Sequence, residues 1–195
     1  MVMILTVWAS EFAAQSTVDE TLIAAIAEGD TEALRHVYGA VSASVYGFAL
    51  SITKNAHDAE DVLQDTFVTI YEKAATYRPQ GKPLAWILTI ARNHALMRIR
   101  SRKREASFED AVSDNSLAFS RIERPEERWA VETLLSLLNE EERQIVALHA
   151  VAGLKNREIA AVMKLPLGTV LSKYNRAVKK LKAHREKEDI AYENI

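Results

Sequence analysis

The stretch from Gly168 to Leu181 constrains the fold most, because at 3.6 residues per turn it separates into two faces. One face is apolar and suits a small core: Val170, Tyr174, Ala177, Val178 and Leu181. The other face is polar and mostly cationic: Thr169, Ser172, Lys173, Arg176, Lys179 and Lys180. A helix of this kind fits the major groove of DNA and its flanking phosphates.

A shorter helix and a tight turn precede this one. Residues 157–162 repeat apolar side chains at helical spacing, and 163–165 supply the turn. Pro166 stands in the first turn of the next helix, where its missing N–H costs nothing. Together the two segments predict a helix-turn-helix, and they favour nucleic-acid binding over catalysis.

Composition favours an all-α fold. The 195 residues include only four prolines and six glycines, and long stretches repeat apolar residues at helical rather than alternating spacing. With 48% hydrophobic residues the chain can bury a core, which argues against general disorder. The absence of cysteine excludes disulfides and thiolate metal sites and is consistent with a reducing cytoplasm.

Helix stop signals and caps divide the chain into two helical modules joined by a flexible linker. We expect an N-terminal extension over 1–18, a first module over 19–104, a linker over 105–124, a second module over 125–187 and a tail over 188–195. The expected helices cover 19–28, 31–55, 58–77, 84–104, 126–138, 140–150, 157–163 and 168–186. Asn139 is the expected cap of the helix that starts at Glu140. The apolar start, residues 1–8, is too short to span a bilayer, so no membrane insertion is expected.

The formal charge of −2 conceals a block distribution. One basic block lies in residues 92–104: Arg92, Arg98, Arg100, Arg102, Lys103 and Arg104. A second lies in residues 173–187: Lys173, Arg176, Lys179, Lys180, Lys182, Arg185 and Lys187. Acidic sequence separates the two blocks, which predicts two contacts with a polyanion on two modules. Each block alone is equally consistent with a solvated helix face.

The helix expected at 84–104 carries one polar strip, formed by Thr89, Arg92, Asn93, Arg100 and Lys103. One apolar flank contains Leu84, Ile87, Leu88, Ala91 and Ala95, and the other contains Trp86, Ile90 and Met97. We therefore expect burial on both flanks. Guanidinium and amide groups on such a strip can bind phosphates and base edges, although a merely solvated face is the alternative.

The helix expected from Asp58 opens with acids. Asp58, Asp61 and Asp65 share a face, and Glu60 and Gln64 share the adjacent one. A metal-dependent hydrolase built on Asp58, Glu60, Asp61 and Asp65 lacks ligands from a second element. Acids in a first turn also complement the helix dipole. An exposed acidic patch that docks on a basic protein surface explains the charge without catalysis.

Three segments, in this order, resemble the extracytoplasmic-function (ECF) sigma factors of bacterial RNA polymerase. Residues 58–67 (DAEDVLQDTF) resemble the core-polymerase-binding helix of that family. Residues 83–93 (PLAWILTIARN) resemble its promoter-melting and minus-ten reading helix. Residues 165–170 (LPLGTV), with the following Ser172, Lys173, Arg176 and Ala177, resemble its minus-thirty-five reading helix. The resemblance covers both modules and implies a region 2-like bundle followed by a region 4-like helix-turn-helix.

The resemblance implies a role for each matching residue. The residues expected against the polymerase clamp are Asp58, Asp61, Gln64 and Asp65, with Phe67 packed inside. Those expected at the minus-ten element are Tyr77, Thr89, Arg92, Asn93, Arg100 and Lys103. The break at 77–82 matches the loop that receives a flipped base, where Tyr77 is either a stacking partner or a buried edge tyrosine, and Trp86 is assigned to packing. Those expected at the minus-thirty-five duplex are Arg157, Pro166, Thr169, Ser172, Lys173, Arg176 and Lys180.

The family likeness also implies the partners. We expect core RNA polymerase, promoter DNA and an anti-sigma factor that clamps both modules, with no cofactor, no catalytic residues and a cytoplasmic location. Met97, Leu171, Tyr174 and the pair Asn156-Arg157 depart from the family pattern, and Leu171 removes one expected contact from the basic face. The alternative is a stand-alone helix-turn-helix transcription regulator. It would need a dimer interface, and no heptad pattern predicts one.

Overall fold

The computed structural model describes residues 18–105 and 136–193, and the side chains of 18–104 and 136–184. Within these ranges every regular element is a helix, which confirms the all-α prediction. The elements are α2 (Glu20–Ala27), α3 (Thr31–Thr53), α4 (Ala56–Lys73), the 3-10 turn η1 (Ala74–Thr76), α5 (Pro83–Glu105), α7 (Glu140–Ala150), α8 (Asn156–Met163) and α9 (Leu167–Glu193). The helix predicted at 126–138 and the linker at 105–124 lie almost entirely outside the described residues, as does most of the extension at 1–18.

Side-chain caps set most of the helix starts. Asp19 accepts a hydrogen bond from the backbone N–H of Thr21 at 2.9 Å and caps α2. Asp30 caps α3 in the same way, accepting from Glu32 at 2.8 Å. Asn139 and Glu142 form a reciprocal capping box at the start of α7, with bonds of 2.9 and 3.1 Å. The prediction that Asn139 caps this helix is confirmed.

Several predicted helix boundaries were wrong. The second helix was expected to reach Asn55, but it ends at Thr53, and the Asn55 side chain instead accepts from the backbone of Asp58 at 2.9 Å. Asn55 is therefore the cap of α4, which begins at Ala56 rather than at Asp58. The last helix was expected to end near residue 186, but α9 continues to Glu193. The chain has no glycine or proline after Gly168 to stop it.

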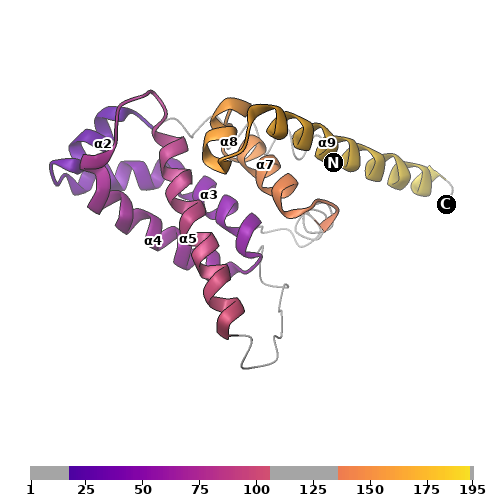
Figure 1. Ribbon diagram of the computed structural model, residues 1–195, viewed down its shortest axis with the longest axis horizontal. Coiled ribbons are helices and arrows are strands. Elements are labelled where there is room, and N and C mark those ends of the chain that lie inside the picture. The colour runs from indigo at the N-terminus through magenta and orange to yellow at the C-terminus, as the bar shows by residue number, and fades with distance from the viewer. Residues whose placement is uncertain (1–17, 106–135, 194–195) are drawn as a thin grey trace.

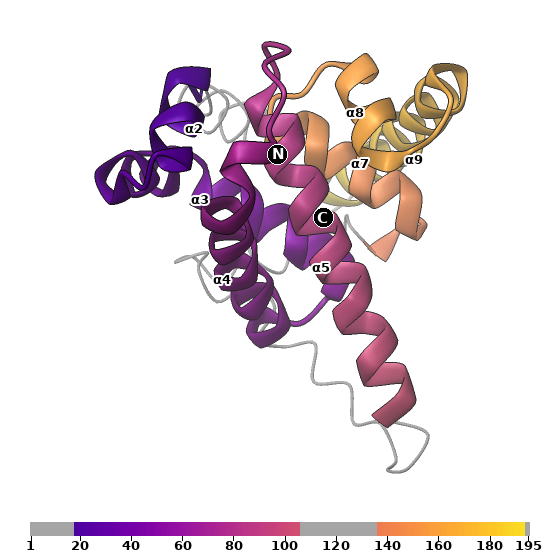
Figure 2. The same ribbon diagram turned by 60° about the vertical axis from the view of Figure 1, so that its left-hand side comes forward.

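Helix α3 lies at the centre of the molecule. Val37, Val41, Val45 and Phe48 are completely buried, and every side chain from 48 to 53 is buried. Burial of six consecutive residues means that the helix is covered on all sides. Helices α4 and α5 pack on one side of α3, and α7 packs on another. Figures 1 and 2 show α7 and α8 lying beside the bundle formed by α2 to α5.

The two modules share one hydrophobic core. Ile145 and Leu148 of α7 and Ile159 of α8 are completely buried and belong to the same cluster as Phe48. The Arg143 side chain of α7, 6% exposed, donates from Nε to the carbonyl of Ser51 in α3 at 2.8 Å. Helix α8 packs against α5. The second module is therefore docked on the first in this structure.

Helices α8 and α9 form the predicted helix-turn-helix. Lys164, in the left-handed region at φ 55°, ends α8 and makes the turn. Val170 and Ala177 are completely buried, and the Tyr174 ring packs on His149 of α7 with centroids 4.6 Å apart. The predicted apolar face of α9 is therefore confirmed. In the described part of the chain no helix has the length and apolar character needed to cross a membrane.

Candidate polymerase and nucleic-acid interfaces

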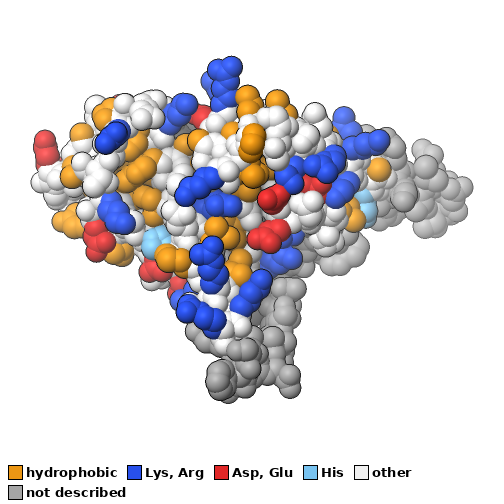
Figure 3. Space-filling model, in the orientation of Figure 1, with side chains coloured by type: hydrophobic (Ala, Val, Ile, Leu, Met, Phe, Trp, Pro, Cys, Tyr) orange, Lys and Arg blue, Asp and Glu red, His pale blue; other side chains and the backbone are white. Residues whose placement is uncertain are grey.

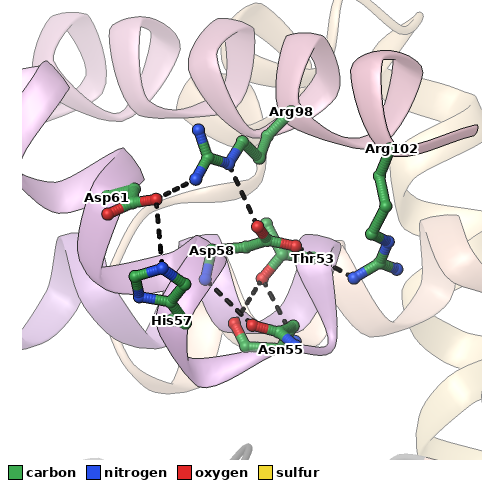
Figure 4. A network of polar contacts seen from close by, with 7 residues as sticks. All are labelled: Thr53, Asn55, His57, Asp58, Asp61, Arg98 and Arg102. Carbon is green, nitrogen blue, oxygen red and sulfur yellow. Dashed lines mark hydrogen bonds and ion pairs between the residues drawn. The ribbon is translucent and has the colours of Figure 1, made fainter. Parts of the chain in front are cut away.

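The acids at the start of α4 are fastened to α5 by arginines. Asp58 accepts from Arg98 Nε at 3.0 Å and from Arg102 at 2.9 Å. Asp61 pairs with the same Arg98 and lies 4.0 Å from the imidazole Nε2 of His57. Figure 4 shows both carboxylates directed at the α5 arginines, with the Asn55 cap beside them. The Asp58 side chain is only 13% exposed, so this network stabilises the α4–α5 packing.

The surface that remains for a protein partner lies further along α4. Gln64 and Asp65 are exposed, and they are followed on the helix by Val68, 58% exposed, and Tyr71, 47% exposed. We call these four residues the α4 face. Phe67 is 7% exposed and packs against the Tyr38 ring, which confirms that it lies inside. Val68 and Tyr71 were not predicted from the sequence, because apolar residues at helical spacing usually belong to the core.

The predicted polar strip of α5 is only partly free. Asn93, Arg100 and Lys103 are exposed, but Thr89 is half-buried and its hydroxyl donates to the carbonyl of Ala85 at 2.8 Å. Among the flanks, the predicted burial of Met97 was wrong, since it is 51% exposed. Helical spacing assigned Met97 to an apolar flank, but the packing leaves that position of α5 exposed.

Arg92 belongs to this strip but lies under the second module. Burial lowers the pKa of its guanidinium, and the charges of Glu140 and Glu141 at the start of α7 oppose that effect. Its Nε is buried and makes no hydrogen bond within the described ranges. The structure therefore brings Arg92 to the contact between the two modules and leaves Asn93 and Arg100 facing solvent.

The break between α4 and α5 surrounds a hollow of about 320 Å³. Its lining includes Tyr77, Gln80, Trp86 and Thr89 from the first module and Ala161 and Val162 from α8. Tyr77 is half-buried and packs on Trp86 with ring centroids 5.2 Å apart. The hydroxyl of Tyr77 donates to Glu20 at 2.6 Å, and burial and this bond raise the pKa of Tyr77. The ring therefore lies at the edge of the fold and also forms a wall of the hollow.

The polar face of α9 divides into exposed and paired residues. Ser172, Arg176 and Lys179 are exposed, as are Arg157 and Pro166, and Thr169 is half-buried. By contrast, Lys173 pairs with Glu141 at 2.5 Å and Lys180 pairs with Glu142 at 2.6 Å. Burial would raise the pKa of Glu142, but hydrogen bonds from Lys180 and Asn139 outweigh it and lower the pKa. The two lysines assigned to DNA thus fasten α9 to α7. Leu171, one of the departures from the family pattern, is 40% exposed on this helix.

Positive charge gathers on two helices. Figure 3 shows Lys and Arg side chains along α5 and along α9, with acidic side chains between them. Within 18–105 and 136–193, no group of three His, Asp or Glu side chains is arranged to hold a metal ion. Asp58 and Asp61 are paired with arginines. The Lys and Arg side chains along α5 and α9 suit the binding of polyanions.

Comparison with known proteins agrees with the all-α fold. The family model for Sigma-70 region 2 matches residues 37–105, and that for Sigma-70 region 4 matches residues 128–181. The ECF RNA polymerase sigma factor EcfG of Rhodopseudomonas palustris is 32% identical over 158 residues, which are 78% of this chain and 85% of that protein. The solved structure of CnrH in complex with the cytosolic domain of CnrY has a TM-score of 0.64 at 24% identity, covering 87% of this chain and 97% of CnrH. That of the Bartonella quintana sigma factor RpoE with the anti-sigma factor NepR has a TM-score of 0.61 at 21% identity, covering 76% and 94%.

The chain therefore belongs to the ECF RNA polymerase sigma factors. It is a transcription initiation factor that binds core RNA polymerase and directs it to promoter DNA. The match over 37–105 argues against the alternative of a stand-alone helix-turn-helix regulator, because such a regulator does not need a region 2 module.

The network of Figure 4 predicts unequal effects of two aspartates on one helix. Asp58→Ala removes bonds to two guanidinium groups, so we expect it to lower the free energy of unfolding by about 1–3 kcal/mol. Asp65→Ala, on the exposed α4 face, should change it by less than about 0.5 kcal/mol. Urea unfolding of both variants measures the difference. Equal effects would contradict the assignment of Asp58 to the α4–α5 packing.

Proposed function

We propose that the chain divides its work among three surfaces: the α4 face binds the polymerase clamp, α5 reads the minus-ten element and α9 reads the minus-thirty-five element. It acts in the cytoplasm without catalytic residues of its own. The observation that supports this most is that two cationic helices, from different modules, both present exposed Arg side chains, while the exposed α4 face carries a single charge, that of Asp65.

The α4 face has the composition of a protein interface. Val68 and Tyr71 supply apolar contact, and Gln64 and Asp65 supply polar groups beside them. Tyr38 is also 45% exposed, and its ring packs on Phe67 directly behind this face. Asp58 and Asp61 act behind the face, because their pairs with Arg98 fix the orientation of α4 relative to α5.

The exposed part of α9 supports major-groove reading. Arg176 can bond to two acceptors of a guanine, and Ser172 can contact a base or a phosphate. Lys179, exposed on the same face, supplies a phosphate contact. Lys173 and Lys180 contribute by fixing the orientation of α9 on α7.

The minus-ten element meets α5. Asn93, Arg100 and Lys103 are exposed along more than two turns of this helix and can follow the backbone of a single strand. The hollow beside Tyr77 is the place for a base that leaves the stack.

An anti-sigma factor is the proposed regulator. The solved structure of Bartonella quintana RpoE is a complex with the anti-sigma factor NepR, and its fold is shared by this chain. We infer that a protein of this kind restrains the chain by binding both modules.

Run-off transcription with core polymerase and a promoter library tests the proposed function. Specific transcripts should require the chain, and Asp65→Lys should reduce polymerase capture at least tenfold by placing a like charge against a basic clamp surface. Glu28→Lys is the matched control, since Glu28 is exposed and follows the end of α2, outside the α4 face. DNA binding that is specific without polymerase, and transcription that ignores the chain, would reject the proposal.

Arg176→Ala should lower initiation about 5- to 100-fold at promoters that depend on the upstream element, which corresponds to loss of one bidentate base contact. Lys182→Ala is its control, because Lys182 is an exposed cation about 120° around the axis of α9. Initiation rates on templates with and without the upstream element give the comparison. An equal loss on both templates would show that Arg176 does not read that element.

A further inference from the structure

We infer that Glu20, at the start of α2, positions the loop at residues 77–82 and so sets which base the hollow accepts. This inference rests on the proposed function, because it assigns a residue to minus-ten reading. Glu20 lies outside the three segments that carry the family likeness, and it also precedes the region 2 match at 37–105.

The contact is made by one oxygen. Oε1 of Glu20 accepts from the Tyr77 hydroxyl at 2.6 Å, from the backbone N–H of Gln80 at 2.8 Å and from that of Gly81 at 2.6 Å. These bonds join residues 57 to 61 positions apart and span the loop. A carboxylate that accepts several donors is strongly favoured in its charged form, and the bonds from Tyr77 and Gly81 lower the pKa of Glu20.

The same bonds determine what faces the hollow. Gln80 and Tyr77 both line it, and the Tyr77 ring packs on Trp86 while its hydroxyl is fixed by Glu20. Two backbone N–H groups of the loop are occupied by the carboxylate, so they are withdrawn from any base that enters. Gly81 has φ 68°, a conformation that few other residues adopt, and Glu20 bonds to the N–H of this residue.

A purely local role does not account for Glu20. Helix α2 is already capped by Asp19 and anchored by Ile23 and Ile26, which are at most 1% exposed. An acid in the first turn would interact favourably with the helix dipole even if its side chain were free in water. Instead the carboxylate reaches the loop and takes three donors from it.

The test is base preference in transcription. Wild type, Glu20→Ala, Glu20→Gln and Tyr77→Phe are compared on templates carrying each of the four bases at each minus-ten position. We expect Glu20→Ala to reduce the preference about tenfold at one position, which is the loss of one to two hydrogen bonds, and Tyr77→Phe about threefold at the same position. Glu20→Gln, which keeps an acceptor oxygen, should lie between Glu20→Ala and wild type. Glu28→Ala, at the residue that follows α2, is the control and should match wild type.

Melting temperature and polymerase capture separate positioning from stability. Both should stay at wild-type values in Tyr77→Phe and Glu20→Gln. Unchanged base preference in Glu20→Ala, or a uniform loss at all four bases, would overturn the inference. If the wild type itself gives no promoter-specific transcripts, that result contradicts the proposed function rather than the role of Glu20.

Discussion

The structure depends on burial of α3 on all sides. An amphipathic helix needs only one covered face, but residues 48–53 of α3 are buried without interruption. Helices α4 and α5 cover one side, and α7 covers another. Because the second cover comes from the other module, a single core joins the polymerase-binding and helix-turn-helix parts of the chain. The arrangement of every DNA-facing residue follows from that packing.

Some charged residues pair with one another and hold the helices together, and others remain exposed for binding. Arg98 and Arg102 neutralise Asp58 and Asp61, and Glu141 and Glu142 pair with Lys173 and Lys180. These pairs orient the helices. Asp65 on α4, Arg100 on α5 and Arg176 on α9 remain exposed and are among the charged groups left for partners. A sequence with nearly balanced net charge can therefore present surfaces of both signs.

Local patterns were sufficient to predict much of the fold. The Asn139 cap, the helix-turn-helix and the apolar face of α9 depend on interactions within a few residues, and the structure confirms them. Contacts between distant segments were not predictable. Helical spacing places Asp58 beside Asp61, but it does not show that α5 arginines lie opposite. The bond from Tyr77 to Glu20 and the burial of Arg92 under α7 are likewise products of packing. The expected roles of the site residues in binding remain predictions.

The packing predicts a sigma factor whose two DNA-reading modules are held together by one core in the free protein. Because the chain lacks cysteine, cysteines that carry spin labels can be introduced at Glu72 on α4 and at Lys179 on α9, both exposed. Pulsed electron paramagnetic resonance then gives the distance between the two labels. The account predicts one narrow distance in the free protein; a broad distribution of distances would contradict it.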